Sequence, residues 1–132
     1  MNLRIDKEGL KKLCQKNGIL LIVLHGSYAE GNEREKSDID IGILSRKKFD
    51  SNKQLNILNE LTEVFGDRFD PVFLNDAEPL ISYRVAIHGK PLFEDEESIF
   101  KRFRIQAIAK YMDSKKFRTL EKSYLKRAIG KA

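Results

Sequence analysis

"LHGSYAEGNEREKSDIDIGIL", residues 24–44, is apolar at both ends and polar in between. The apolar run 19–25 leads into it and is short enough for a strand buried on both faces. Residues 38–44 alternate aspartate with isoleucine at a period of two, which predicts a strand with one buried face. Residues 26–37 are rich in turn formers and charges, which predicts a loop with one helical turn beginning near Ser27. The stretch therefore predicts two strands joined by a polar connection.

Two acids of this stretch share one face of the predicted strand. Asp38 and Asp40 are two positions apart, so their side chains point the same way and their Cα atoms lie roughly 6.5–7 Å apart. A third acid, Asp70, stands near the start of the next predicted strand. If the strands are neighbours, three carboxylates converge, which suits magnesium and the two-metal displacement of a phosphoryl or nucleotidyl group. The alternative is that these acids form the solvated face of an edge strand.

The glycine–serine pair before the acids has the chemistry of a phosphate-binding turn. Gly26 follows the buried strand directly and lets backbone amides approach a ligand closely. A helical turn that begins there offers free N–H groups and a favourable dipole to a phosphate, and Ser27 adds a hydroxyl donor. Most Gly-Ser pairs are ordinary turns. A phosphate-binding turn at a fixed distance from metal-binding acids is a more specific signal.

The rest of the chain reads as helices with one further strand. Residues 68–75 are predicted to form that strand, and Pro71 favours an edge or irregular position for it. The other predicted elements are a helix capped by Asp6 and ended by Gly18; a helix over 51–65 with Leu55, Leu58, Leu61 and Phe65 on its apolar side; a helix capped by Asp76 and ending at His88; a helix over about 97–112 with the acidic run 94–97 at its start; and a basic helical segment after it. We expect one α/β (α+β) domain over residues 1–132, a small mixed sheet flanked by helices with a helical C-terminal third.

Composition excludes several classes of protein. The chain has 132 residues, of which 41% are hydrophobic and 34% charged, as in a globular domain rather than a disordered chain. No apolar run approaches the ~20 residues that a membrane span requires. The one cysteine, Cys14, allows no internal disulfide and favours the cytoplasm, and one cysteine with two distant histidines disfavours a structural zinc site.

Charge is concentrated at the C-terminal end. Residues 101–132 hold eleven Lys and Arg against two acids, a local charge of +9, whereas the preceding residues carry −4. Such asymmetry indicates an acidic partner or a solvated helix face. One hypothesis is that residues 101–131 contact a partner protein. The other is RNA binding, which the scarcity of aromatic residues among the cations disfavours.

The spacing Gly26-Ser27, ten residues, then Asp38-x-Asp40 resembles the signature of the DNA polymerase β-type nucleotidyltransferase superfamily. Together with Asp70 and the continuation "FLNDAEPL…IHGKPLFEDE", it is similar to the minimal nucleotidyltransferases, the MntA-like antitoxins that accompany HEPN-domain toxins. The resemblance covers about residues 8–113. It implies a polymerase β-like fold with a catalytic core over about 8–93 and a basic helical segment over about 97–130.

The resemblance also implies an activity and the residues that carry it. Asp38, Asp40 and Asp70 would bind magnesium, two ions in all, and act in catalysis, while Gly26 and Ser27 would hold the triphosphate of ATP. The substrate implied is a tyrosine of a cognate HEPN-domain toxin, an RNase that receives AMP and is silenced, as in a type VII-like toxin–antitoxin module. The partners implied are that toxin and ATP, in an assembly of like or unlike chains.

Two other functions remain open from the sequence. The family loop often reads Gly-Ser-x-Ala-Arg-Gly, and here Glu30 stands where the arginine would be. If this negative charge weakens the binding of nucleotide, the chain would be a binding antitoxin that blocks its toxin by occlusion. Transfer to a small molecule such as an aminoglycoside is the third reading, although little chain is left for a substrate domain. His25, beside the glycine turn, is expected to be a hydrogen-bonded structural residue rather than an acid–base group.

Overall fold

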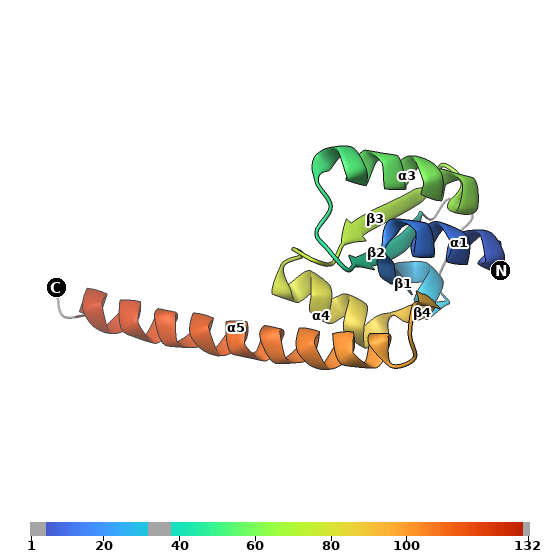
Figure 1. The fold of residues 1–132 in the computed structure, drawn as a ribbon. Helices are drawn as coiled ribbons and strands as arrows, with labels where there is room; N and C mark the ends of the chain where they lie inside the picture. The colour runs from blue at the N-terminus through green and yellow to red at the C-terminus, as the bar shows by residue number, and fades with distance from the viewer. Residues whose placement is uncertain (1–4, 32–37, 131–132) are drawn as a thin grey trace.

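A computed structural model describes residues 5–31 and 38–130, apart from the side chain of Glu30. Four strands form one sheet in the order β3-β2-β1-β4 (Figure 1). The central strand β1 pairs antiparallel with β2 and β4, and β2 pairs parallel with β3, so the sheet is mixed as predicted. The elements are α1 (Lys7–Asn17), β1 (Ile19–His25), α2 (Gly26–Glu30), β2 (Ile39–Ser45), α3 (Ser51–Phe65), β3 (Phe69–Phe73), α4 (Pro79–His88), β4 (Lys90–Glu94) and α5 (Ile99–Gly130).

The sheet has a hydrophobic core on each face. In Figure 1, α1 and α3 lie on one side of the strands and α4 and the first part of α5 on the other. The isoleucines of β2 face the first core and are almost fully buried there with Leu10 of α1 and Leu61 of α3. The intervening positions of β2 face α4 and α5, where Val85 and Phe103 are buried. Asp40, the acid of β2, therefore belongs to the α4–α5 face.

The helix boundaries that depend on caps and glycines follow the sequence closely. Asp6 caps α1, since its side chain accepts a hydrogen bond from the N–H of Gly9 at 3.0 Å, and Gly18 ends the helix at φ 70°. Gly66 closes α3 with a hydrogen bond from its N–H to the carbonyl of Thr62. Pro71 lies in β3 at the edge of the sheet, where a strand tolerates the loss of one N–H donor.

The apolar side predicted for α3 is partly wrong. Leu55 is 61% exposed, whereas Ile57, which the prediction left out, is fully buried. Leu58 packs against the core from a half-buried position, and Leu61 and Phe65 are buried as expected. Ile57, Leu61 and Phe65 repeat every four residues, which aligns one side of the helix with the sheet. Leu55 satisfies a helical spacing with Leu58, but on the solvent side.

This difference gives a stability test. Ile57→Ala leaves a cavity in the α3 core, and we expect it to lower the free energy of unfolding by about 2–5 kcal/mol. Leu55→Ala removes a side chain of the same size from an exposed position, and it should change that free energy by less than about 0.5 kcal/mol. Urea denaturation followed by circular dichroism measures both. Equal losses for the two variants would contradict the burial that the structure assigns to α3.

The largest correction concerns residues 90–98. The sequence predicts that the acidic run 94–97 starts a helix, but residues 90–94 form β4, which pairs with β1, and α5 begins at Ile99. Glu94 instead accepts a hydrogen bond from the N–H of Phe100 at 3.0 Å and so satisfies one of the free donors at the start of α5. Pairing with β1 outweighs the local preference, and it packs the half-buried Leu92 and Phe93 against the core.

Asp76 does not cap α4 as predicted. The helix begins at Pro79 after Glu78, without a side-chain cap, and ends at His88 as expected. A proline at the first helical position explains the later start, since its fixed φ suits that position and its missing N–H would have no helical partner there. Asp76 forms an ion pair with Lys48 at 3.3 Å instead.

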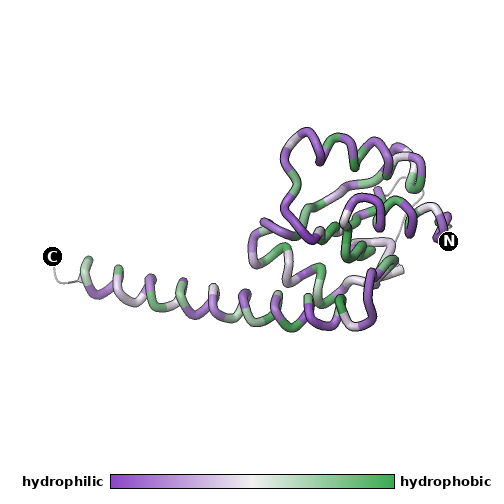
Figure 2. Tube along the Cα trace, in the orientation of Figure 1, coloured by the Kyte–Doolittle hydropathy of each residue, from purple (hydrophilic) through white to green (hydrophobic). Residues whose placement is uncertain are grey.

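The two C-terminal helices of the prediction are one helix of 32 residues, α5. Its first turns cover the sheet, and the rest extends away from the other elements (Figure 1). Phe117, Leu120, Tyr124 and Ile129 are each at least 67% exposed on this extension, and green positions recur along it in Figure 2. None of the described helices is long and apolar enough to cross a membrane.

Candidate functional site

The predicted acids of β2 and β3 meet because the two strands pair in parallel. Asp40 is the direct partner of Asp70 in that ladder, and His25 of β1 is the antiparallel partner of Asp40. Neighbouring strands lie about 4.8 Å apart, so the three side chains form a row across one end of the sheet. Because directly paired residues point to the same face, this row lies on the α4–α5 face. The expected convergence of Asp40 and Asp70 is therefore what the structure contains.

A second row runs beside the first, two residues earlier. Asp38 lies just before β2 and Arg68 just before β3, and their side chains approach to 4.0 Å between Oδ1 and Nε. Both side chains are more than half exposed, so this ion pair stabilises the fold little. Asp38 thus shares the edge of the site with the other acids, with its carboxylate turned toward a cation. The equal spacing in Asp38-Ile39-Asp40 and Arg68-Phe69-Asp70 is the sequence signal for this contact, which the prediction missed.

The Gly-Ser turn is in contact with the acids. Gly26 has φ 69°, and a Cβ at this position would collide with the carboxylate of Asp40. Ser27 follows in the first turn of α2, whose initial N–H groups have no helical acceptors. Only glycine can adopt this φ cheaply and also leave room for Asp40. The turn and the acid pair are therefore one structural unit, to which we refer as the carboxylate site (Gly26, Ser27, Asp38, Asp40 and Asp70).

His25 lies at the inner end of the row and is only partly the structural residue that the sequence predicts. It makes a hydrogen bond with the backbone of Ile41, as expected. Its Nε2 atom, however, is buried and has no hydrogen-bond partner among the described residues. Burial lowers the pKa of the imidazole, and this outweighs the opposite effects of Asp40 and Asp70. His25 is therefore a neutral ring at neutral pH, packed beside the acids.

Burial and the neighbouring negative charges both disfavour the charged form of Asp40. The pKa of Asp40 is raised above its ordinary value of 3.8, first by burial and then by the negative charges of Asp70 and Asp38, while His25 acts in the opposite direction. The half-buried Asp40 is thus the member of the site whose charge is least favourable. A cation that binds between these carboxylates would remove that cost.

We expect Asp40→Asn to raise the melting temperature of the metal-free protein at neutral pH. The raised pKa means that the folded state binds a proton more tightly than the unfolded chain does, so stability falls as pH rises from 3.8 through the folded pKa. Asparagine does not titrate, so its stability lacks this dependence on pH. The difference in melting temperature between the variant and the natural protein should therefore disappear below pH 3.8. Calorimetry at neutral and acidic pH measures it. Asp67→Asn, at an exposed position before β3, is the control, and a gain of the same size there would contradict the assignment.

The residues of the carboxylate site fit a divalent cation in chemistry and placement. Among residues 5–31 and 38–130, no three His, Cys, Asp or Glu side chains already stand in a metal-binding arrangement. The reason is visible in the geometry, since Asp38 is turned toward Arg68 and Asp70 is exposed. Asp40 and Asp70 are direct partners in the β2–β3 ladder, so their side chains leave the same face of the sheet, and the exposed Asp38 stands two residues before Asp40. The side chain of Glu30 lies outside the described residues.

Comparison with known proteins places this geometry in a class. A mixed sheet that carries a glycine–serine turn beside paired acids is the architecture of nucleotidyl-transferring domains, and the family model described as polymerase beta nucleotidyltransferase matches residues 8–98. The chain belongs to this family.

Relatives within the family share much of the chain. "Protein adenylyltransferase MntA" of Aphanizomenon flos-aquae is 32% identical over 117 residues, which cover 81% of this chain and 78% of that protein. The protein of the same name from Shewanella oneidensis is 26% identical over 110 residues, 82% of this chain and 78% of that one.

Solved structures share the fold over nearly the whole chain, including α5. A toxin–antitoxin crystal structure with AMP-PNP matches with a TM-score of 0.74 at 24% identity, covering 91% of this chain and 98% of that one. A complex of tri-AMPylated Shewanella oneidensis HEPN toxin with MNT antitoxin matches with a TM-score of 0.67 at 23% identity, covering 90% and 94%. The polymerase β-like fold predicted from the sequence is confirmed.

Proposed function

We propose that this chain is a magnesium-dependent protein adenylyltransferase that transfers AMP from ATP to a tyrosine of a HEPN-domain toxin and so acts as an antitoxin. The observation that carries the proposal is the direct pairing of Asp40 with Asp70 beside the Gly26 turn. The names of the relatives support the choice of reaction, and the toxin–antitoxin complexes support the choice of partner.

The residues of the site divide the work by position. Asp38, Asp40 and Asp70 would hold magnesium, which when bound neutralises the leaving pyrophosphate and acidifies the attacking hydroxyl. The N–H groups at the start of α2 and the hydroxyl of Ser27 would bind the phosphates of ATP. Asp40 contacts the glycine turn on one side and pairs with Asp70 on the other. It would therefore fix the distance between the turn that binds the phosphates and Asp70, which would receive the tyrosine hydroxyl.

Asp70 is the acid best placed for the incoming tyrosine. It is exposed and lies on the edge strand β3, whereas Asp40 is half-buried near the start of the inner strand β2. A tyrosine hydroxyl has a pKa of about 10 and needs a proton acceptor to attack at neutral pH. Asp70 would orient that hydroxyl and accept its proton as the oxygen attacks the α-phosphorus and pyrophosphate leaves.

Incubation of this protein with a HEPN-domain toxin and α-labelled ATP tests the proposal. We expect label on the toxin, the mass of one or more AMP groups on a tyrosine peptide, and loss of RNase activity in step with labelling. A toxin that is silenced without any change in mass would instead support occlusion by binding. Labelling of serine or lysine peptides alone would contradict the tyrosine assignment.

A further inference from the structure

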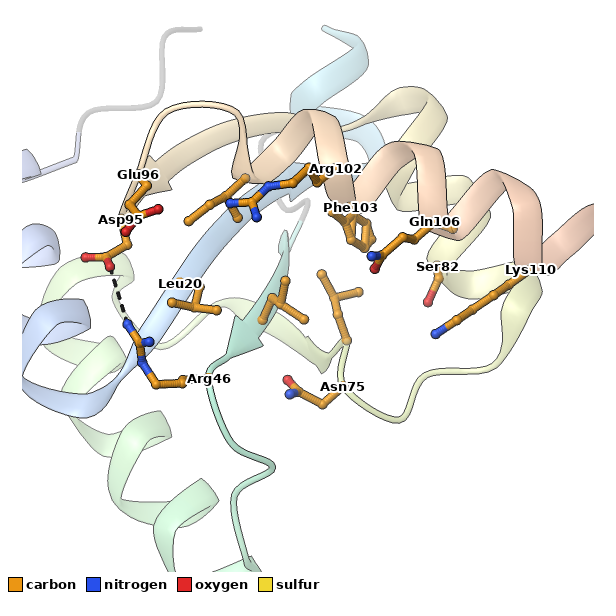
Figure 3. A pocket seen from close by; sticks show the side chains of 14 residues that line it. Leu20, Arg46, Asn75, Ser82, Asp95, Glu96, Arg102, Phe103, Gln106 and Lys110 are labelled. Atoms are coloured by element: carbon orange, nitrogen blue, oxygen red, sulfur yellow. Dashed lines mark ion pairs between the residues drawn. The ribbon is translucent and has the colours of Figure 1, made fainter.

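A cavity of about 460 Å³ lies between α5 and the ends of β2 and β3 (Figure 3). It is on the same face of the sheet as Asp40 but at the other end, because Leu44, which lines it, is four residues further along β2. At the rise of a strand this separation is about 13 Å. Within the described residues, no member of the carboxylate site lines this α5 cavity. Its volume is in the range of small-molecule sites, roughly 300–1,000 Å³.

Three polar side chains of α5 extend over the cavity without partners. Arg102, Gln106 and Lys110 are spaced four residues apart on one side of the helix, and Figure 3 shows them extending from it over the opening. None of the three side chains makes a hydrogen bond or ion pair with another described residue. By contrast, Arg104 and Arg118 on the same helix lie over aromatic rings. The cavity therefore has two uncommitted cations and an amide at one wall.

The other walls favour a ligand with an apolar body. Leu20 and Leu44 are only half-buried at the end of the sheet, and Phe103 lies beneath α5 between the cationic positions. The acidic residues, Asp95 and Glu96, lie at the far end of the cavity, where Asp95 pairs with Arg46 at 3.8 Å. A bound anion would therefore be placed at the α5 wall, with the rest of the molecule over the leucines.

The opposite wall is rigid and polar. Two hydrogen bonds with the backbone of Ser45 fix Asn75. Its Oδ1 accepts from the N–H of Ser45 at 3.0 Å, and its Nδ2 donates to the carbonyl of Ser45 at 2.9 Å. Ser82 of α4 adds a hydroxyl nearby.

Arg102 and Lys110 are about 12 Å apart along the helix, and both side chains are long enough to meet an anion above Gln106. The distance suits one anionic group held from two sides.

We propose that the α5 cavity binds a small organic anion, a molecule with a phosphate or carboxylate group on a flat apolar body, with Arg102, Gln106 and Lys110 on the anion and Leu20 and Leu44 under the body. This site is separate from the carboxylate site, and its existence does not depend on AMP transfer.

Nitrogen-15 NMR titration of the full chain without magnesium tests the proposal. The probes are AMP, adenosine, inorganic phosphate and indole-3-acetate, which separate the contributions of the phosphate, the carboxylate and the body. We expect AMP or indole-3-acetate to shift the resonances of Gln106 and Ala107 saturably, at least about tenfold more tightly than adenosine or phosphate. Whichever of the two anions binds more tightly identifies the group that the site prefers.

Charge-matched variants identify the site. Arg102→Gln with Lys110→Gln should weaken binding at least about tenfold, whereas Lys115→Gln with Lys122→Gln, on the same helix outside the cavity, should leave it unchanged. Asp40→Asn should also leave it unchanged. No saturable shift at millimolar probe, equal losses in both double variants, or a loss in Asp40→Asn would each overturn the proposal. Because labelling of the toxin is measured separately, failure here leaves the proposed function standing.

Discussion

Asp40→Asn is expected to abolish AMP transfer, with a loss of at least about a thousandfold, while the domain remains folded. Asparagine has the size of aspartate but lacks the charge that a cation requires, and metal ions supply several kcal/mol to reactions of this type. Asp40 contacts the glycine turn and pairs directly with Asp70, so its charge belongs to the centre of the site. Single-turnover transfer of labelled AMP to the toxin measures the effect.

A binding measurement separates the role in metal binding from a general loss of structure. Magnesium should raise the melting temperature of the natural protein, because a bound cation offsets the burial and the neighbouring negative charges that raise the pKa of Asp40. The same magnesium should leave the melting temperature of Asp40→Asn almost unchanged. Asp67→Asn serves as the control and should keep both the response and the activity. Normal AMP transfer by Asp40→Asn would refute the metal assignment.

Gly26→Ala is expected to reduce AMP transfer by about a hundredfold or more. A Cβ at Gly26 collides with the Asp40 carboxylate, and a shift of about 1 Å in a reacting group costs that much in rate. Alanine at a φ of 69° also strains the backbone by about 1 kcal/mol. The measurement is the transfer rate at saturating ATP together with the melting temperature.

Gly18→Ala is the matched control for the backbone strain. Gly18 has φ 70° at the end of α1, and a Cβ there meets nothing within 4 Å. It should lose a similar amount of stability and keep full activity. If the two variants were equally active, the contact between Gly26 and Asp40 would have no part in catalysis.

The sequence predicted the parts of the fold that depend on local chemistry. The cap at Asp6, the turns at Gly18 and Gly66 and the edge position of Pro71 all follow from the preferences of single residues, and the structure contains each of them. The strand at residues 90–94 could not be predicted in the same way. Its register with β1 is a long-range property, and the acids after it imitate the start of a helix.

The sequence predicted which acids lie together in the candidate site, but not which other side chains contact them. The pairing of Asp40 with Asp70 was expected from spacing and family resemblance. The contacts with His25 and Arg68 depend on the register of three strands, and the equal spacing of Asp38-x-Asp40 and Arg68-x-Asp70 points to the Arg68 contact only once that register is known. The catalytic roles of Asp38, Asp40 and Asp70, the division into a core and a basic segment, and a contact between residues 101–131 and the toxin stay predictions.

The parallel pairing of β2 with β3 has a consequence for how the site assembles. Gly26, Ser27, Asp38 and Asp40 belong to one antiparallel hairpin that closes over a short length of chain, but Asp70 joins them only after α3 has crossed over and docked. The entropy cost of closing this loop arises before the contacts between the parallel strands form. Partial melting of α3 would therefore release the third carboxylate and leave the first two in place. Such a protein would lose its catalytic competence on warming before it lost its global structure.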